Sequence, residues 1–175
     1  EWESFAPGDK WDPPAFWAPY VKAGSEPNML ARGGHADALD WDRHLGHVGI
    51  IYDMLLPFYI LGGRPACDDC GIAESGNGIP DLLDEARNEV DFWLALRDGE
   101  GYSHGVTNPD GDGTMYQADA TSCAAWASAA NAAMLASCLA LAGLDELADS
   151  YTASALEAWR VGSLYPADEL DRFQH

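Results

Sequence analysis

The chain has few basic residues, and this scarcity excludes several classes of partner. Its 9 lysines and arginines face 29 aspartates and glutamates, a formal net charge of -20 at pH 7 over 175 residues. Only Lys10 and Lys22 are lysines. A surface of this sign repels nucleic acid and anionic lipid, so neither is expected as a partner. A strongly acidic surface also favours solubility, and it indicates nothing about a mechanism.

Long hydrophobic runs are missing too. No uninterrupted run of about eighteen apolar residues occurs, so no membrane contact is predicted. The sequence begins without an initiator Met or a signal peptide, which predicts a mature chain or a piece of a longer protein. Hydrophobic residues still make up 47% and aromatic residues 11%. This composition and length predict one folded domain with a core.

Cysteine is rare, with four residues in the chain. Cys67 and Cys70 stand in a loop rich in glycine, proline and aspartate, and could form a disulfide, half of a zinc site or two free thiols. Of these three we favour the disulfide. A redox motif is not expected, because no strand precedes the pair. Cys123 and Cys138 lie in one predicted helix, roughly 22 Å apart, too far for a disulfide. Both are expected to be buried.

Clear β-strand patterns, nucleotide-binding loops and short repeats are absent as well, which predicts an all-α fold of antiparallel helical hairpins. Residues 1–34 are expected to form an irregular lead-in, since prolines and tryptophans are frequent there. Apolar residues at helical spacing then predict four helices. Their approximate ranges are 42–61, 80–97, 120–141 and 145–159.

Individual residues set the expected helix boundaries. Pro57 should kink or end the first helix. Pro80 suits the first turn of the second helix, and Gly143 should stop the third. The apolar stripe of the second helix leaves Glu85 and Glu89 largely outside it, so neither is expected in the core.

An acidic loop, Gly33–His44, reads Gly-Gly-His-Ala-Asp-Ala-Leu-Asp-Trp-Asp-Arg-His. Asp37 and Asp40 stand where this loop meets the first predicted helix. Two carboxylates so spaced can converge on one water molecule, one accepting its proton while the other orients it. That is the general-base half of an inverting glycosidase. By itself an Asp-x-x-Asp pair is more often a helix cap or a solvated turn.

A second segment, Glu74–Ala86, follows and reads Glu-Ser-Gly-Asn-Gly-Ile-Pro-Asp-Leu-Leu-Asp-Glu-Ala. In their order, spacing and residue identities the two segments resemble the N-terminal part of the catalytic module of glycoside hydrolase family 9, the cellulase family. That family has a Gly-Gly-Trp/Tyr-x-Asp-Ala-Gly-Asp loop, then a helix, then a Ser-Gly-Asn-Gly-Ile-Pro-Asp-x-Leu-Asp-Glu stretch. The resemblance implies a secreted enzyme that cleaves β-1,4-glucan with inversion.

The resemblance also implies an (α/α)6 barrel of twelve helices, of which four to five are present here. Residues 35–175 are accordingly expected to be the incomplete N-terminal portion of such a domain. A partial barrel leaves apolar helix faces exposed. We therefore expect the missing helices to come from further polypeptide or from another chain.

Matched residue by residue, Asp40 takes the position of the catalytic base, and Asp37 that of its partner on the nucleophilic water. Leu39 stands where the family usually has glycine. If that position needs a positive φ, leucine is strained there.

Three neighbours are candidate substrate contacts. Trp41 could stack on a sugar ring or belong to the core. His44 could contact substrate hydroxyls or be a solvated helix residue, and Arg43 is expected to pair with a loop carboxylate. The Glu74–Ala86 motif is expected to be structural, with glycines that permit a tight turn and acids that cap the second helix.

A calcium loop is a second candidate metal site. Asn108, Asp110 and Asp112 place oxygen ligands at alternate positions. The later bidentate glutamate of an EF-hand is missing, and Asp-Gly pairs are ordinary turn formers, so a turn is favoured. The expected reaction requires no cofactor.

The proton donor of the family is a glutamate near the C-terminal end of its module, and this chain has no counterpart. The leading hypothesis is therefore part of a β-1,4-glucan hydrolase whose acid lies outside these residues. The alternative is a non-catalytic helical glycan-binding or scaffold protein that keeps the fold and lacks the acid. Endo and exo action stay equally open.

Overall fold

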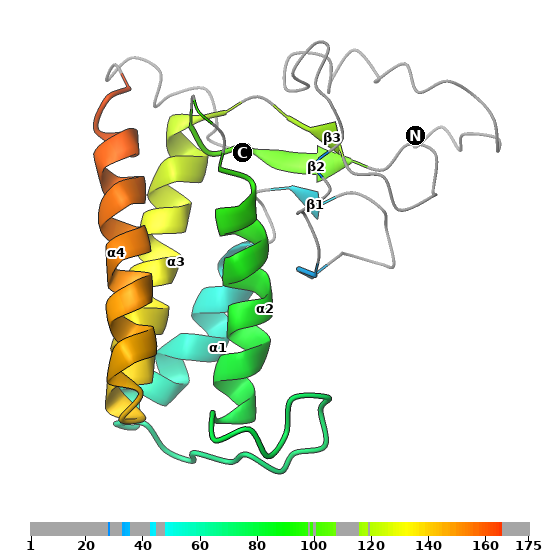
Figure 1. Ribbon diagram of the computed structural model, residues 1–175, viewed down its shortest axis with the longest axis vertical. Coiled ribbons are helices and arrows are strands. Elements are labelled where there is room, and N and C mark those ends of the chain that lie inside the picture. Colours follow the sequence, from blue (N-terminus) through cyan, green and yellow to red (C-terminus); the bar gives the residue numbers. More distant parts are fainter. Residues whose placement is uncertain are drawn as a thin grey trace, which may run out of the picture.

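Figure 1 shows the computed structural model of the protein. The residues that it describes are 28, 33–35, 43–44, 48–97, 99, 101–107, 116–118 and 120–165. Helices dominate this part of the chain, as predicted. They are α1 (Gly49–Ile60), α2 (Asp81–Ala95), α3 (Ser122–Leu141) and α4 (Asp145–Gly162). Helices α2, α3 and α4 stand side by side, and α1 crosses behind them (Figure 1).

The boundaries of the later helices agree with the prediction. Pro80 immediately precedes α2. The side chain of Thr121 caps α3 by accepting a hydrogen bond of 3.1 Å from the backbone N–H of Ala124. Gly143 separates α3 from α4 with a φ of +77°, a left-handed conformation that glycine adopts freely.

The prediction for the first helix, 42–61, is wrong at its start and agrees with the structure at its end. Helix α1 begins at Gly49, because Arg43–His44 form a strand instead of a first helical turn. Pro57 does not end the helix, which continues to Ile60. A proline this close to the C-terminal end removes one N–H donor, and the last turn still closes through a 3.0 Å bond from Leu61 N–H to the Pro57 carbonyl.

Contrary to the prediction, the structure contains β-strands. They are β1 (Arg43–His44), β2 (Gly105–Thr107) and β3 (Tyr116–Gln117), antiparallel in the order β1-β2-β3. Val106 pairs with Arg43 on one side and with Gln117 on the other. Strands of two or three residues are too short to show the alternation that indicates a strand. The small sheet lies beside the C-terminal end of α2 (Figure 1).

The main core lies between α1, α2 and α3. Its largest fully buried side chains include Phe58, Phe92, Ile51, Leu55, Leu135 and Leu139. Cys138 is fully buried among them, as predicted, and burial raises the pKa of its thiol to about 11. Cys123 is only half-buried.

Helix α3 is apolar around most of its circumference. Among the described residues it alone is long and apolar enough to cross a membrane, with 56% of its most apolar window buried by the rest of the fold. Polar residues such as Ser128 and Asn131 interrupt the run, which is why no continuous hydrophobic stretch is visible in the sequence. A core helix packed inside a protein passes the same test, so this property is weak evidence for a membrane.

Candidate active site

The structure does not test the roles predicted for the catalytic carboxylates. Asp37, Asp40 and Trp41 lie outside the described residues. Arg43 and His44 form β1, where only their backbone is described. The roles of these five residues therefore stay predictions. The structure describes residues 33–35 and 43–44 of the loop, and these show what it contacts at each end.

Two glycines at the start of the acidic loop lie directly against α2. Gly33 and Gly34 have φ values of +78° and +72°. A Cβ on Gly34 would lie 2.7 Å from Cγ of Phe92, and a Cβ on Gly33 would collide with the side chain of Asn88. Glycine is therefore required here twice, for the left-handed backbone and for the close approach to the helix.

The next residue is fixed by a buried carboxylate. Glu89 of α2 has no solvent-exposed surface, and its Oε2 accepts a hydrogen bond from the backbone N–H of His35. The other oxygen, Oε1, accepts the indole N–H of Trp93 at 2.7 Å. Both oxygens of the carboxylate are thus occupied, one by the helix itself and one by the loop.

The ring of His35 lies between two carboxylates. Its Nε2 is 2.5 Å from Oε1 of Glu85, whose side chain is 45% exposed. Its Nδ1 is 3.5 Å from Oε2 of Glu89, an ion-pair distance without hydrogen-bond geometry. Glu85 and Glu89, one helical turn apart on α2, therefore both contact His35 of the loop.

The expectation that Glu89 stays out of the core is wrong. Its side chain turns inward because Trp93, one turn further along α2, offers a buried N–H donor that needs an acceptor. A glutamate four residues before a tryptophan on a helix is the one sequence signal that could have indicated this pairing.

At its other end the acidic loop joins the sheet. Arg43 and His44 pair with β2, so the stretch 36–42 runs between two fixed points, α2 and the sheet. The sheet is in turn tied to α2: Gln117 of β3 donates from Nε2 to the carbonyl of Leu96 at 2.9 Å, and its Oε1 accepts from Asn28 at 2.7 Å. Helix α2 therefore serves as the common support for both ends of the loop.

The Glu74–Ala86 motif is structural, as predicted, but its acids act differently from the prediction. No side chain caps the N-terminus of α2. Instead the buried Asp81 accepts the N–H of Cys70 at 2.6 Å and the hydroxyl of Ser75 at 2.7 Å. Asp68 accepts the N–H groups of Gly76 at 2.7 Å and Gly78 at 2.8 Å. The aspartates hold the turn that precedes the helix.

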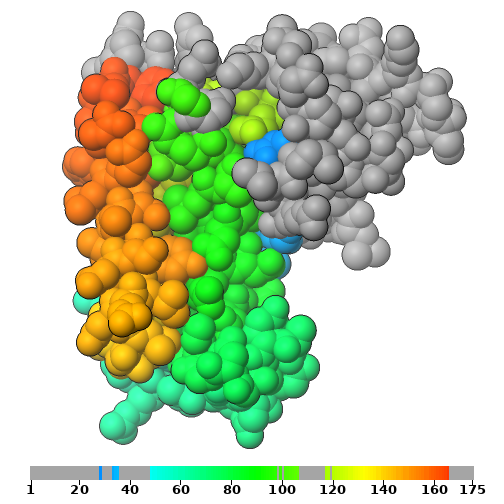
Figure 2. All heavy atoms as spheres, in the orientation of Figure 1, coloured from blue at the N-terminus to red at the C-terminus, as the bar shows by residue number. Residues whose placement is uncertain are grey.

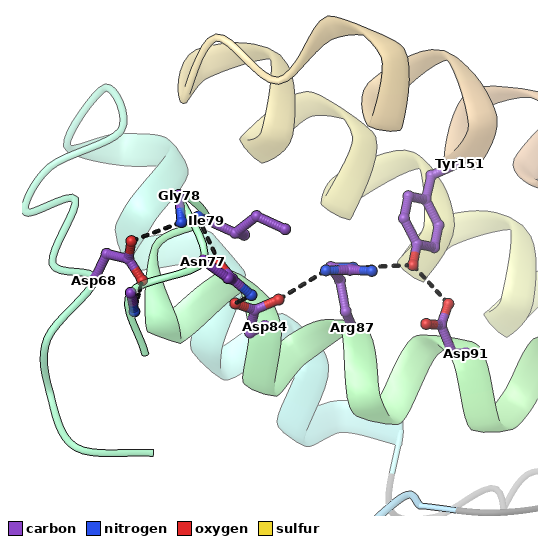
Figure 3. A network of polar contacts seen from close by, with 9 residues as sticks. Asp68, Asn77, Gly78, Ile79, Asp84, Arg87, Asp91 and Tyr151 are labelled. Carbon is purple, nitrogen blue, oxygen red and sulfur yellow. Dashed lines mark hydrogen bonds and ion pairs between the residues drawn. The ribbon is translucent and has the colours of Figure 1, made fainter. Parts of the chain in front are cut away.

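A chain of polar contacts continues from this turn along α2 (Figure 3). Asp84 accepts from Asn77 at 2.9 Å and pairs with Arg87 at 2.7 Å. Arg87 then donates to the hydroxyl of Tyr151 on α4 at 3.3 Å. The Tyr151 hydroxyl donates to Asp91 at 2.6 Å, and burial is the main cause that raises its pKa to about 12. This network joins α2 to α4, which adjoin along the face drawn in Figure 2.

The turn and the acidic loop meet α2 at different places. The turn lies at the N-terminal end of the helix, whereas the sheet lies near its C-terminal end (Figure 1). From Asp81 to Glu89 the helix rises roughly 12 Å. The motif therefore builds the start of α2, and Glu85 and Glu89, further along this helix, contact the loop at His35.

The sulfurs of Cys67 and Cys70 lie 2.8 Å apart, and the structure holds both residues as thiols. The Cys67 thiol donates to Asp69 at 2.9 Å, and this hydrogen bond is the main cause that raises its pKa to about 11. Among the described residues no group of three metal-ligating side chains comes together, and the disulfide stays a prediction.

The predicted calcium loop cannot be placed. Asn108, Asp110 and Asp112 lie outside the described residues, so both the turn and the calcium site stay predictions.

Comparison with known proteins gives a match among solved structures. No protein-family model matches the chain, and no curated protein matches it. Among solved structures it is similar to the crystal structure of a metagenome-derived glycoside hydrolase family 9 endoglucanase, with a TM-score of 0.62 and 27% identity. The match covers 79% of this chain and 28% of that one, so the chain spans less than a third of the length of its neighbour. The predicted fold class, a portion of a helical barrel, is confirmed.

Proposed function

We propose that these residues are the N-terminal part of the catalytic domain of a glycoside hydrolase that cleaves β-1,4-glucan with inversion. One observation carries the proposal: the Gly33–His35 segment docks on α2, the helix that completes the Glu74–Ala86 motif. Both segments that resemble family 9 thus belong to one packed unit. The similarity to an endoglucanase of that family supports the same function.

Asp40 and Asp37 carry the chemistry in this proposal. Asp40 accepts a proton from the attacking water, and Asp37 accepts a second hydrogen bond from that water and so orients it. Anchors on both sides of the loop favour a defined position for the base, which is what catalysis by positioning requires. The acid, a glutamate on further polypeptide, stands roughly 6.5–9.5 Å from the base and leaves room for the water.

Substrate contacts follow from the same loop. Trp41 offers an aromatic face to a sugar ring, and Arg43 and His44 at the start of the sheet offer hydrogen-bond donors to its hydroxyls. The reaction as proposed uses two carboxyl groups and requires no cofactor. A polymeric substrate also places the enzyme outside the cell.

Further helices of the same polypeptide are the proposed partner of the α3–α4 hairpin. A hollow of about 850 Å³ runs between these helices and is lined mainly by alanines, with Trp126, Leu156 and Trp159. Leu156 is 65% exposed and Trp159 60% exposed, unusual values for side chains of this size. The matching endoglucanase is more than three times as long as the matched part, which supports polypeptide rather than solvent as the cover.

One feature favours the non-catalytic alternative. Leu39 stands where the family usually has glycine, directly before the proposed base. A glycan-binding protein that has lost the acid would tolerate that change, because binding does not need the base in a productive geometry.

Replacing Asp40 by asparagine in the complete protein separates the two functions. We expect reducing-sugar release from soluble β-1,4-glucan to fall by about 10²–10⁴-fold, while glucan affinity stays unchanged. Asp42→Asn, in the same loop and without an assigned role, is the matched control. Hydrolysis that survives in Asp40→Asn would make the base assignment wrong. A wild-type protein that binds glucan without hydrolysing it would support the alternative.

A further inference from the structure

We propose that Glu89 is a positioning residue that fixes the entry of the acidic loop, so that its carboxylate sets where the catalytic base stands. The inference rests on the proposed function for its catalytic consequence. Its structural part concerns described residues alone: Glu89, Trp93 and His35.

Burial makes the Glu89 carboxylate unusual. It is a charged group with no exposed surface on a helix face that otherwise buries Val90, Phe92 and Trp93. A carboxylate in the core is costly unless it is fully hydrogen-bonded. Trp93 occupies only Oε1, so the remaining oxygen needs a donor, and the backbone N–H of His35 supplies it. Folding of the helix is thereby coupled to docking of the loop.

The contact is specific to a carboxylate. An ionised carboxylate only accepts hydrogen bonds, through two oxygens, and here it faces two N–H donors. The two donors face different oxygens, so a glutamine in the same position turns its NH₂ group toward one of them and an N–H then meets an N–H. The His35 contact goes to the main chain, so it fixes the loop backbone and not merely one side chain.

The described start of the loop, Gly33–His35, has little freedom to adjust around this contact. Gly34 already touches the ring of Phe92 so closely that a Cβ would lie 2.7 Å from Cγ. Asp37 follows His35 by two residues and Asp40 by five. A displacement of about 1 Å at a reacting group can reduce the rate about 10²-fold, so loss of the anchor should appear in kcat.

The test uses three variants in the complete protein on a Trp93→Phe background. Within the part of the chain that the structure describes, removing the indole N–H leaves the backbone N–H of His35 as the hydrogen-bond donor to residue 89. Glutamate at 89 is the reference, Glu89→Met removes the acceptor, and Glu89→Gln restores one acceptor oxygen. We expect kcat on soluble β-1,4-glucan to fall by about 10²-fold for methionine, with little change in KM, and to recover for glutamine.

Thermal unfolding keeps this result apart from a loss of fold. Replacing a buried charge by a well-packed apolar side chain is often neutral or stabilising, so the methionine variant should be folded but slow. Recovery by glutamine is the decisive observation, since a merely structural role gives no reason for an amide to restore kcat. Equal kcat values for the methionine and glutamate forms would overturn the inference.

Hydrogen exchange at the His35 amide supplies a readout that does not need activity. Exchange should speed up several-fold with methionine and slow again with glutamine. If the reference protein hydrolyses no β-glucan, the proposed function fails, and this exchange alone decides whether Glu89 anchors the loop. Identical exchange in all three proteins would refute the anchor itself.

Discussion

Gly34→Ala is the most direct perturbation of the contact between the acidic loop and α2. The glycine has a φ of +72°, and an added Cβ would meet the Phe92 ring at 2.7 Å from Cγ and 2.8 Å from Cδ1. Two separate penalties follow: strain of an alanine in the left-handed region, and overlap with a fully buried aromatic ring that has no space to move.

Both penalties have known sizes. A left-handed conformation costs a non-glycine residue about 1–2 kcal/mol. Overpacking of a close contact costs about 1–3 kcal/mol more. We therefore expect Gly34→Ala to lower the free energy of unfolding by about 2–5 kcal/mol, a large part of the 5–15 kcal/mol typical of a domain.

The chain offers a matched control for this experiment. Gly62 has a similar φ of +64°, but an added Cβ there would meet no atom within 4 Å. Gly62→Ala thus carries the strain without the overlap and should cost about 1–2 kcal/mol. Urea unfolding of both variants, followed by far-ultraviolet circular dichroism, measures the difference.

The difference between the two variants is the informative quantity. A Gly34→Ala protein that is no less stable than Gly62→Ala would refute the close approach of the loop to Phe92. If the loop also carries the base, Gly34→Ala should reduce glucan hydrolysis while Gly62→Ala leaves it unchanged, because Gly62 lies in the turn after α1, away from the loop.

Three further predictions concern other parts of the fold. The pKa of Tyr151 is raised to about 12, so as pH rises the unfolded chain loses this proton before the folded protein does. The free energy of unfolding should therefore fall between about pH 10 and 12, and Tyr151→Phe should flatten that part of its pH profile in urea unfolding. Thr121→Ala removes the cap of α3 and should lower the free energy of unfolding by about 0.5–2 kcal/mol, whereas Thr121→Ser should restore most of it. If Cys67 and Cys70 form the predicted disulfide, alkylation without reductant should leave both unmodified in peptide mass spectra; labelling of either thiol would contradict it.

Much of the helical architecture follows from local sequence. Helix α2 begins beside Pro80 and α3 ends beside Gly143, the two residues that predict these boundaries, because proline placement and glycine stops depend on near neighbours in the chain. The strands could not be predicted in the same way. Residues Arg43–His44 are extended only because β2, distant in sequence, pairs with them.

The candidate site divides along the same line. Its two motif segments, Gly33–His44 and Glu74–Ala86, are recognisable in the sequence, because the order and spacing of their glycines and acidic residues are local properties. How they are joined is not local. Glu89 looks like a solvent-facing residue on a helical wheel, yet it is fully buried, because Trp93 and the backbone of His35 supply donors that no periodicity reveals.

By itself, then, the sequence determined the helices, the turn before α2 and the identity of the acidic loop, all of which depend on short-range steric and capping preferences. Only the packing of distant segments shows that α2 holds the start of the loop at His35 and also contacts the sheet that the end of the loop joins. The physical reason is that a buried carboxylate and a close glycine contact acquire their partners only when distant segments pack together.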